Sequence, residues 1–438
     1  MADVNQAAPV PALPGIAQAA VKVGGNAGGN EGREGHGVPS QNIGLPALIG
    51  LVTGVQALAT FTVLALPTLA IKAAPDLGVG PEAAGYQISV IYSAAACISG
   101  MSGLLVRRYG AALVSLVAMA FCAAGLLGVA SGHWGAAILG SLTMGAAYGL
   151  TNPAASHLLL RYAPPQHQNL IFALKQTGVP LGGILAALLL PALEKKFGWQ
   201  LSLVAGTGLI AALCLMLWLA RHRLDADRDP SAKLTGGLLK GVRVVVANPV
   251  LRSLAVMGLT YASFQFCLFT FLITMLVKDF GWSLVEAGGI ATLLQVGGAL
   301  GRIAWSVLAD RIGHGLWVLL VIGLASAAFA GLLGLAEAAW PVPLLTAVLF
   351  GFGFCLVGWN GLWMAEIART SNPGEVGLAT GGVLVFTYIG VMLGPAAFAL
   401  IYRCFGSYAT TYAAFGALSL IGAAALLSAI RHRAQAGG

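Results

Sequence analysis

Residues 315–336 read GLWVLLVIGLASAAFAGLLGLA, a run of 22 residues that contains no charged side chain. A helix of about 20 apolar residues is long enough to cross the hydrocarbon core of a bilayer. Eleven further apolar segments occur near residues 45–71, 84–105, 109–131, 135–162, 168–192, 200–221, 251–277, 285–309, 341–367, 376–402 and 407–430. The sequence therefore predicts an all-α membrane protein with twelve transmembrane helices.

The composition excludes an ordinary soluble protein. Apolar residues make up 58% of the 438 residues and charged residues only 9%, whereas soluble proteins carry about a quarter charged residues. The 60 glycines suit membrane helices, because small residues let such helices approach closely. The chain also lacks phosphate-binding, nucleophile-elbow and metal-ligand motifs. We therefore expect no enzyme activity, no cofactor, no metal and no nucleic-acid partner.

The chain divides into two six-helix bundles, expected over residues 43–221 and 251–430. Between them lies the longest polar stretch, residues 222–250, which we interpret as a cytoplasmic linker. Residues 1–42 are rich in Ala, Gly, Pro and Asn and are expected to form a disordered cytoplasmic tail. Residues 431–438 would form a second short tail on the same side.

The basic residues predict the orientation in the membrane. With both termini placed inside, 17 of the 23 Lys and Arg residues lie on the inner side and five on the outer side, with Lys175 inside a helix. Inner loops of membrane proteins carry such an excess. We expect a monomeric multi-pass protein of the plasma (inner) membrane with cytoplasmic termini.

The two bundles repeat one another. Asp76-Leu-Gly after the first expected helix matches Asp279-Phe-Gly after the seventh. In the fourth helix of each half, Gly145, Asn152 and Arg161 match Gly353, Asn360 and Arg369 at a constant offset of 208 residues. Parallel repeats of this kind place a substrate site at their interface, near the middle of the membrane.

The segment from Ser306 to Gly313, SVLADRIG, resembles the G-x-L-a-D-R-x-G loop of the major facilitator superfamily. The resemblance implies the twelve-helix facilitator fold, carrier-type transport and a gating role for Asp310 and Arg311. The first copy, GLLVRRYG, has Arg107 where the family has its Asp, followed by Arg108. These two arginines are gating candidates by position, but a tight basic turn that obeys the positive-inside rule is the preferred interpretation.

Two cations lie inside expected helices, where charges are costly and usually functional. Lys175 lies about 10 Å and Arg302 about 12 Å from the cytoplasmic ends of their helices, from the helical rise. Arg302 also resembles the helix 8 arginine of oxalate–formate exchangers and monocarboxylate porters. The alternative for both cations is snorkelling to the cytoplasmic interface or pairing with backbone carbonyl groups. The eleventh helix has Thr387 and Tyr388 but no lysine, which argues against oxalate itself.

The other polar candidates are weaker. All 15 acidic residues fall in tails, loops or helix ends, so no carboxylate is placed to neutralise an organic cation. His157 is a possible proton site, because histidine titrates near neutral pH. Neutral binding or packing roles are open for the remaining polar residues of the first, fourth, seventh and tenth helices: Gln56, Asn152, Tyr261, Gln265 and Asn360.

Three functions follow as hypotheses. The first is a carrier for a small organic anion, a carboxylate, working by proton symport or anion exchange. The second is proton-driven efflux of drugs or metabolites, because Gly178-Val-Pro-Leu-Gly-Gly183 partly resembles the antiporter motif of efflux carriers. The extra Val breaks that motif, and a kink for close helix packing is the preferred interpretation. The third is a receptor or scaffold that binds without transporting.

Overall fold

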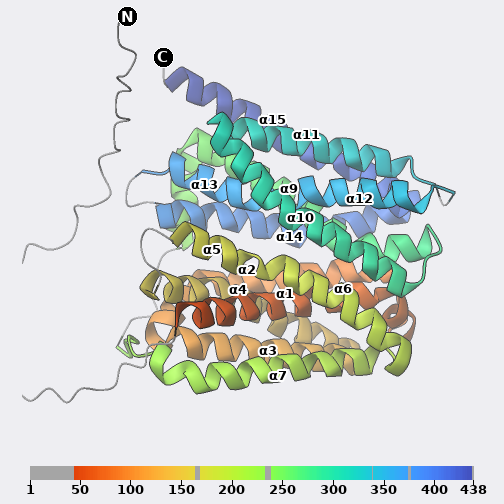
Figure 1. Cartoon of the computed structure of the whole chain (residues 1–438), viewed down its shortest axis with the longest axis horizontal. Coiled ribbons are helices and arrows are strands. Elements are labelled where there is room, and N and C mark those ends of the chain that lie inside the picture. The colour runs from red at the N-terminus through yellow and green to blue at the C-terminus, as the bar shows by residue number, and fades with distance from the viewer. Residues whose placement is uncertain (1–43, 163–167, 232–237, 338, 373–375, 437–438) are drawn as a thin grey trace, which may run out of the picture. The chain divides into compact units, whose positions relative to one another are not determined.

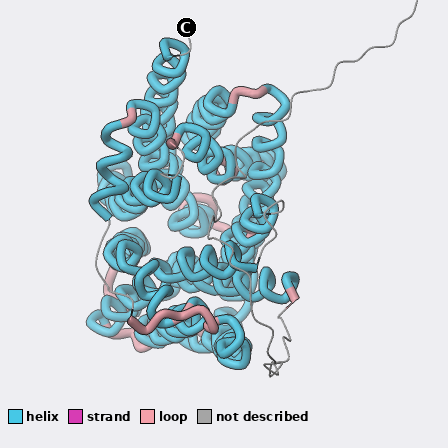
Figure 2. The backbone as a smooth tube through the Cα atoms, turned by 90° about the vertical axis from the view of Figure 1, so that its left-hand side faces the viewer, coloured by secondary structure: helices cyan, strands magenta, loops and turns pink. Residues whose placement is uncertain are grey.

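A computed structural model describes residues 44–162, 168–231, 238–337, 339–372 and 376–436, and in these ranges the regular elements are helices (Figure 2). The expected tail at residues 1–42 lies outside this part of the chain. The first half contains α1 (Leu45–Asp76), η1 (Pro81–Ala83), α2 (Ala84–Tyr109), α3 (Ala111–Ala130), α4 (Trp134–Tyr162), α5 (Gln168–Gln176), α6 (Gly178–Phe197) and α7 (Trp199–Leu224). The second half contains α8 (Leu238–Ala247), α9 (Pro249–Lys278), α10 (Leu284–Ile312), α11 (Gly315–Gly334), α12 (Val342–Leu356), α13 (Asn360–Thr370), α14 (Val376–Phe405) and α15 (Tyr408–Ala436).

Each of the twelve expected segments coincides with a helix or with two consecutive helices. The segment at 168–192 is divided into α5 and α6, and the segment at 341–367 into α12 and α13. Among the described residues, ten helical segments are long and apolar enough to cross a membrane, or eleven if the bent α2 region is one span; two of the ten, Leu174–Phe197 and Val342–Thr370, run across the α5–α6 and α12–α13 breaks. The remaining expected span is α4, whose polar residues Asn152, Pro153 and His157 reduce its apolar character.

The outer surface of the bundle suits a lipid environment. Large apolar side chains such as Leu139, Leu219 and Ile303 are more than 60% exposed. Such exposure would be unfavourable in water, but it costs nothing against lipid tails. The exposed apolar side chains therefore agree with the membrane assignment from composition.

The repeated Asp-x-Gly sequences make equivalent contacts in the two halves. Asp76 accepts a hydrogen bond from the Trp199 indole at 2.6 Å, and Asp279 accepts one from the Tyr408 backbone at 2.8 Å. Each aspartate thus joins the end of the first long helix of its half to the start of the last one. The glycines that follow, Gly78 and Gly281, have φ angles of 66° and 73°, which glycine adopts most readily.

Two repeated glycines allow close helix contacts. A Cβ atom at Gly145 would lie 2.0 Å from the Ile91 carbonyl oxygen, and one at Gly353 would lie 2.4 Å from the Leu294 carbonyl oxygen. Hence α4 packs directly on the backbone of α2, and α12 packs in the same way on α10. The repeat seen in the sequence therefore records equivalent packing inside each half.

The halves form separate layers, with α1–α7 in the lower part of Figure 1 and α9–α15 in the upper part. They meet mainly along α2 with α14 and α6 with α10. We call the end of the bundle where α7 ends and α9 begins the linker end. Toward the opposite end, Gly85 packs on the Pro395 carbonyl, Gly288 packs on the Ala187 carbonyl, and Ser89 donates to the Met392 carbonyl. The halves are thus held closely together away from the linker end.

Candidate binding site

Lys175 is at the centre of a polar cluster in the first half. Its side chain is buried, with 3% of its surface exposed. The Nζ atom donates to Gln56 Oε1 at 2.9 Å and also to Asn152 Oδ1. The structure therefore brings together three of the predicted binding residues, which come from α5, α1 and α4.

The partners of Lys175 are neutral amides. Within the described residues, no carboxylate forms an ion pair with this ammonium group. A buried charge needs a compensating partner, and amide oxygens supply only part of that compensation. In the described part of the chain, the cluster therefore lacks a negative charge, which a bound anion would supply.

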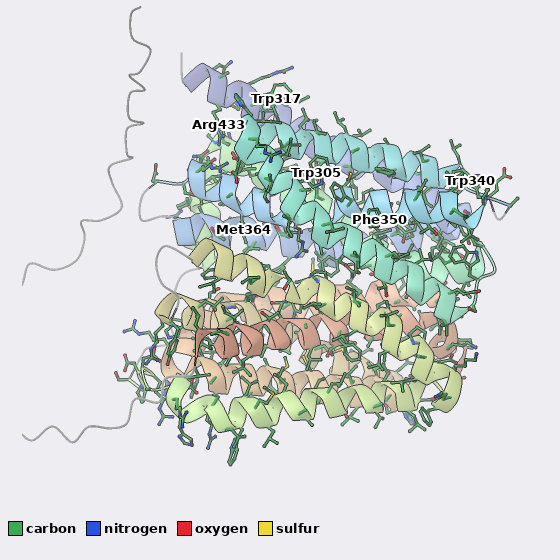
Figure 3. All side chains as sticks on the ribbon, viewed as in Figure 1. Trp305, Trp317, Trp340, Phe350, Met364 and Arg433 are labelled. Carbon is green, nitrogen blue, oxygen red and sulfur yellow. The ribbon has the colours of Figure 1, made fainter. Side chains whose placement is uncertain are left out.

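Arg302 links the two halves through backbone carbonyl groups. Its Nη1 atom donates to the Gln176 carbonyl in the first half at 3.1 Å, and its Nε atom donates to the Val357 carbonyl in the second half at 3.3 Å. Nearby on the same helix, Trp305, which is labelled in Figure 3, donates to the Phe354 carbonyl at 3.0 Å and packs on the Phe354 ring. Arg302 is thus positioned at the interface and, like Lys175, has no carboxylate partner among the described residues.

Breaks in two helices expose the carbonyl groups that Arg302 contacts. The Gln176 carbonyl would normally accept from the residue four positions later, but this residue is Pro180, which has no N–H. Val357 follows the last residue of α12, where the span is interrupted before α13. Interrupted helices whose free backbone groups face a central site are a recurrent feature of transporters.

Aromatic side chains from both halves adjoin this polar cluster. Tyr148 of α4 lies beside Gln56 and close enough to Arg302 for an electrostatic interaction, and Tyr388 of α14 lies beside Asn152. The Tyr92 ring lies between them, with centroids 5.4 Å from Tyr148 and 6.0 Å from Tyr388. Nothing in the sequence distinguished Tyr92 and Tyr148 from ordinary core aromatic residues.

A separate polar group in the second half contains no cation. Gln265 Oε1 accepts from the Asn360 amide at 3.2 Å and from the Trp359 indole at 2.9 Å. Thr387 of the eleventh expected helix donates to the Val383 carbonyl of its own helix. Asn360 therefore does not contact the two cations, although it corresponds by repeat to Asn152.

Tyr261 lies outside the cluster. It is fully buried, donates to the Leu319 carbonyl at 3.2 Å and packs edge-on against the Trp359 ring. These contacts attach α9 to α11 within the second half. The packing of these helices points Tyr261 away from the other half, so its predicted contact with substrate has no support from its placement.

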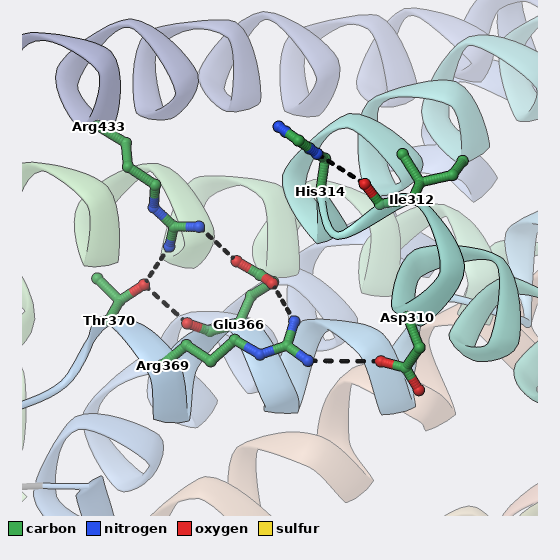
Figure 4. Close-up of polar contacts among 7 residues, drawn as sticks. All are labelled: Asp310, Ile312, His314, Glu366, Arg369, Thr370 and Arg433. Atoms are coloured by element: carbon green, nitrogen blue, oxygen red, sulfur yellow. Dashed lines mark hydrogen bonds and ion pairs between the residues drawn. The ribbon is translucent and has the colours of Figure 1, made fainter. Parts of the chain in front are cut away.

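One gating candidate of the second half, Asp310, belongs to an ionic network at the linker end (Figure 4). Asp310 lies 3.5 Å from Arg369, which also contacts Glu366 at 2.7 Å. Arg433 of α15 contacts the other oxygen of Glu366 at 2.9 Å. Arg311 is exposed. The structure adds Glu366, whose side chain is only 1% exposed, as the central acid of this network.

In the first half, a different acid is placed at the start of α3. Asp225 accepts from the backbone N–H groups of Ala112 and Leu113 at 2.7 and 2.9 Å. Burial raises the pKa of Asp225 above its ordinary value, while these hydrogen bonds lower it. A carboxylate at a helix N-terminus is favoured by the helix dipole. Asp225 thus supplies a helix-capping acid in the half whose loop has Arg107 in place of Asp.

The other candidates of the first half also lie at the linker end. Arg107 is 3.5 Å from Asp229, and the Arg108 guanidinium lies over the Tyr109 ring. Hydrogen bonds from Ser231, and the nearby Arg107, lower the pKa of Asp229. His157 contacts Asp227 at 2.8 Å, as does Arg161 at 2.6 Å. His157 is therefore part of a surface ion-pair group and does not contact the Lys175 cluster.

Comparisons with known proteins agree with this architecture. The chain is similar to the nucleoside transporter NupG, whose solved structure superimposes with a TM-score of 0.71 at 18% identity, covering 88% of this chain and 100% of that one. It is 28% identical over 280 residues to an uncharacterized MFS-type transporter of Mycobacterium tuberculosis, covering 63% of this chain and 60% of the relative. It is also 27% identical over 291 residues to the gallate transporter of Pseudomonas putida, covering 57% and 63%, respectively.

The alignments thus span about three-fifths of the length of these curated relatives. A sequence model of the Major Facilitator Superfamily matches residues 49–381, which include most of both halves. This match, the helical bundle and the repeated halves lead to one conclusion: the chain is a multi-pass membrane protein that belongs to the Major Facilitator Superfamily.

Proposed function

We propose that this chain is a secondary active carrier that moves a small organic anion, a carboxylate, by alternating access. The coupling would be proton symport or exchange for another anion. The observation that carries the proposal is the pair of cations, Lys175 and Arg302, at the interface between the halves with only neutral described partners. The gallate transporter among the relatives is consistent with an anionic substrate.

The chemistry of the two cations suits a carboxylate. The planar guanidinium group of Arg302 can donate two parallel hydrogen bonds to a carboxylate, and its carbonyl partners are neutral groups that an anion could replace. Lys175 would add a second charge from the first half. A substrate held between both halves would favour their closure around it, as alternating access requires.

The alternative functions would require different chemical groups or different behaviour at this site. A carrier of organic cations needs an acidic group in the cluster, and the described residues place none there. Efflux of an anion remains compatible with the same site, because the cluster does not determine the direction of transport. A receptor would bind the anion but would not move it across the membrane.

Substitution of Arg302 tests the proposal. The purified protein would be reconstituted in liposomes and assayed with a panel of labelled carboxylates, with and without a pH gradient. Arg302→Lys keeps the positive charge but loses the planar guanidinium group with its two parallel donors. Carboxylate binding should therefore weaken by about tenfold or more if Arg302 makes two hydrogen bonds to the substrate. Arg302→Gln and Lys175→Gln should each abolish uptake while the protein remains folded and inserted.

Arg403→Gln is the matched control, because Arg403 is an exposed arginine in the last turn of α14, outside the cluster. It should transport at the parental rate. Parental uptake by Arg302→Gln, or transport of an organic cation in place of an anion, would show that the anion-carrier assignment is wrong. Binding without uptake in the parent protein would support the receptor instead.

A further inference from the structure

We infer that the carried anion is an aromatic carboxylate with a ring hydroxyl group, a hydroxybenzoate-type compound. The inference rests on the proposed function and specifies its substrate class. It comes from one juxtaposition: aromatic side chains from both halves lie beside the amide partners of Lys175, and one of them, Tyr148, also lies near Arg302. Buried polar atoms without hydrogen-bond partners lie in the same place.

The aromatic group spans the interface between the halves. Tyr92 of α2 packs edge-on against Phe266 of α9, with ring centroids 4.8 Å apart, and lies 6.0 Å from Tyr388 of α14. Tyr148 of α4, which is also in the first half, packs beside Tyr92 and belongs to the same group. Tyr148 lies 14 residues into a 29-residue helix, near its middle. A substrate ring between the halves would therefore meet aromatic edges and faces, a favourable arrangement for another ring.

The amide groups connect the aromatic side chains to the cations. Gln56 and Asn152 both accept hydrogen bonds from Lys175, and they lie beside Tyr148 and Tyr388, respectively. Tyr148 is also in electrostatic reach of Arg302. A carboxylate on the cations would thus place an attached ring among these aromatic side chains.

Two polar atoms in this group lack a hydrogen bond of good geometry with any described residue. They are the Gln56 Nε2 amide and the Tyr92 hydroxyl, and both side chains are only 1% exposed. Tyr148 lies close enough to Tyr92 and Gln56 to interact with both, but not in the geometry of an ordinary hydrogen bond to either atom. Buried polar groups normally have partners. A phenolic hydroxyl can accept from the amide and exchange a hydrogen bond with Tyr92, which an acid without a hydroxyl group cannot do.

Three probe compounds separate the contributions of ring and hydroxyl: 4-hydroxybenzoate, benzoate and cyclohexanecarboxylate. Binding to the full-length purified protein would be measured by calorimetry, and uptake by reconstituted liposomes. We expect 4-hydroxybenzoate to bind about fivefold more tightly than benzoate, which is the effect of one net hydrogen bond. Benzoate should in turn bind severalfold more tightly than cyclohexanecarboxylate, which has the same carbon count but no aromatic ring.

Tyr92→Phe removes one hydroxyl and keeps the ring. It should reduce the preference for 4-hydroxybenzoate over benzoate, because only the Gln56 amide remains as a partner for the ring hydroxyl, while retaining the preference for benzoate over cyclohexanecarboxylate. Tyr412→Phe is the control, because Tyr412 is a buried tyrosine that donates to the Cys267 carbonyl inside the second half. It should keep both preferences.

The outcomes separate this inference from the proposed function. Equal binding of the three compounds, together with loss of that binding in Arg302→Gln, would overturn the aromatic substrate class and leave the anion carrier intact. Loss of the hydroxyl preference in Tyr412→Phe but not in Tyr92→Phe would also overturn the placement of the ring. No binding of any carboxylate would overturn both conclusions.

Discussion

Single residues determine the charge and the backbone partners of the candidate site. Lys175 and Arg302 provide the positive charge, while Pro180 leaves the Gln176 carbonyl available to Arg302 across the interface. Pro180 belongs to the segment that partly resembles the efflux motif, and the structure shows what this proline does here. Its absent N–H enables a hydrogen bond between the two halves.

Pro180→Ala tests this consequence. The new N–H can donate to the Gln176 carbonyl within the helix and compete with Arg302. The guanidinium would then be freer to bind the substrate, so anion affinity should rise by about threefold or more, because a hydrogen bond to a charged group contributes more than a neutral one. Affinity and maximal uptake rate would be measured separately in liposomes.

Pro191→Ala in the same helix is the control. Pro191 similarly leaves the Ala187 carbonyl without its helical donor, but this carbonyl faces Gly288 and no cation. Its anion affinity should stay at the parental value. Equal changes in both variants would indicate a general effect of helix straightening rather than competition for Arg302.

At the scale of elements, Glu366 joins three helices at the linker end. It lies in α13, contacts Arg433 of α15 and packs against Gly315 at the start of α11. Asp310, which the family resemblance emphasises, is by contrast 73% exposed, and among the described residues its ion-pair partner is Arg369, at 3.5 Å. Exposed pairs contribute little to stability, whereas a buried acid with two arginine partners is costly to remove.

We therefore expect Glu366→Gln to reduce the free energy of unfolding by about 1–3 kcal/mol, because it weakens hydrogen bonds to charged groups. Asp310→Asn should change it by less than about 1 kcal/mol and should slow turnover more than it weakens substrate binding. Chemical unfolding in detergent and transport in liposomes would measure the two effects. A larger loss of stability in Asp310→Asn would contradict the assignment of Glu366 as the central acid.

At the scale of the whole bundle, the two ends differ in how closely the two halves contact each other. Away from the linker end, the halves are in close contact through Gly85, Gly288 and Ser89. At the linker end, the ion pairs of Glu366 join elements of the second half, and those of Asp227 join α4 to the turn after α7. This arrangement suits a carrier whose halves separate at the linker end.

The charge distribution predicts that the linker end faces the cytoplasm. Reporter fusions after Gly438 and within residues 222–250 should therefore report a cytoplasmic location, because most basic residues lie on that side. A fusion near Lys195, at the end of α6, should report the outside. Reporters on the linker and at Lys195 that give the same location would contradict both the orientation and the number of spans.

The sequence by itself determined the helical segments, their repetition and the presence of two intramembrane cations. These features can be predicted from sequence because a bilayer requires long apolar helices with internally satisfied backbone groups, and because charged residues are rare within such helices. Lys175, Gln56 and Asn152 were separate candidates in the sequence, and only the structure showed that they are in direct contact.

Only the tertiary structure decided which side of each helix meets which neighbour. Tyr261 and Tyr92 are both tyrosines in long apolar helices, yet one attaches α9 to α11 and the other lies at the interface between the halves. The rotation of a helix about its axis depends on its packing partners, because nearly every face of such a helix is apolar. For the same reason, the capping of α3 by Asp225, which is distant in sequence, could not be predicted from the loop that contains Arg107.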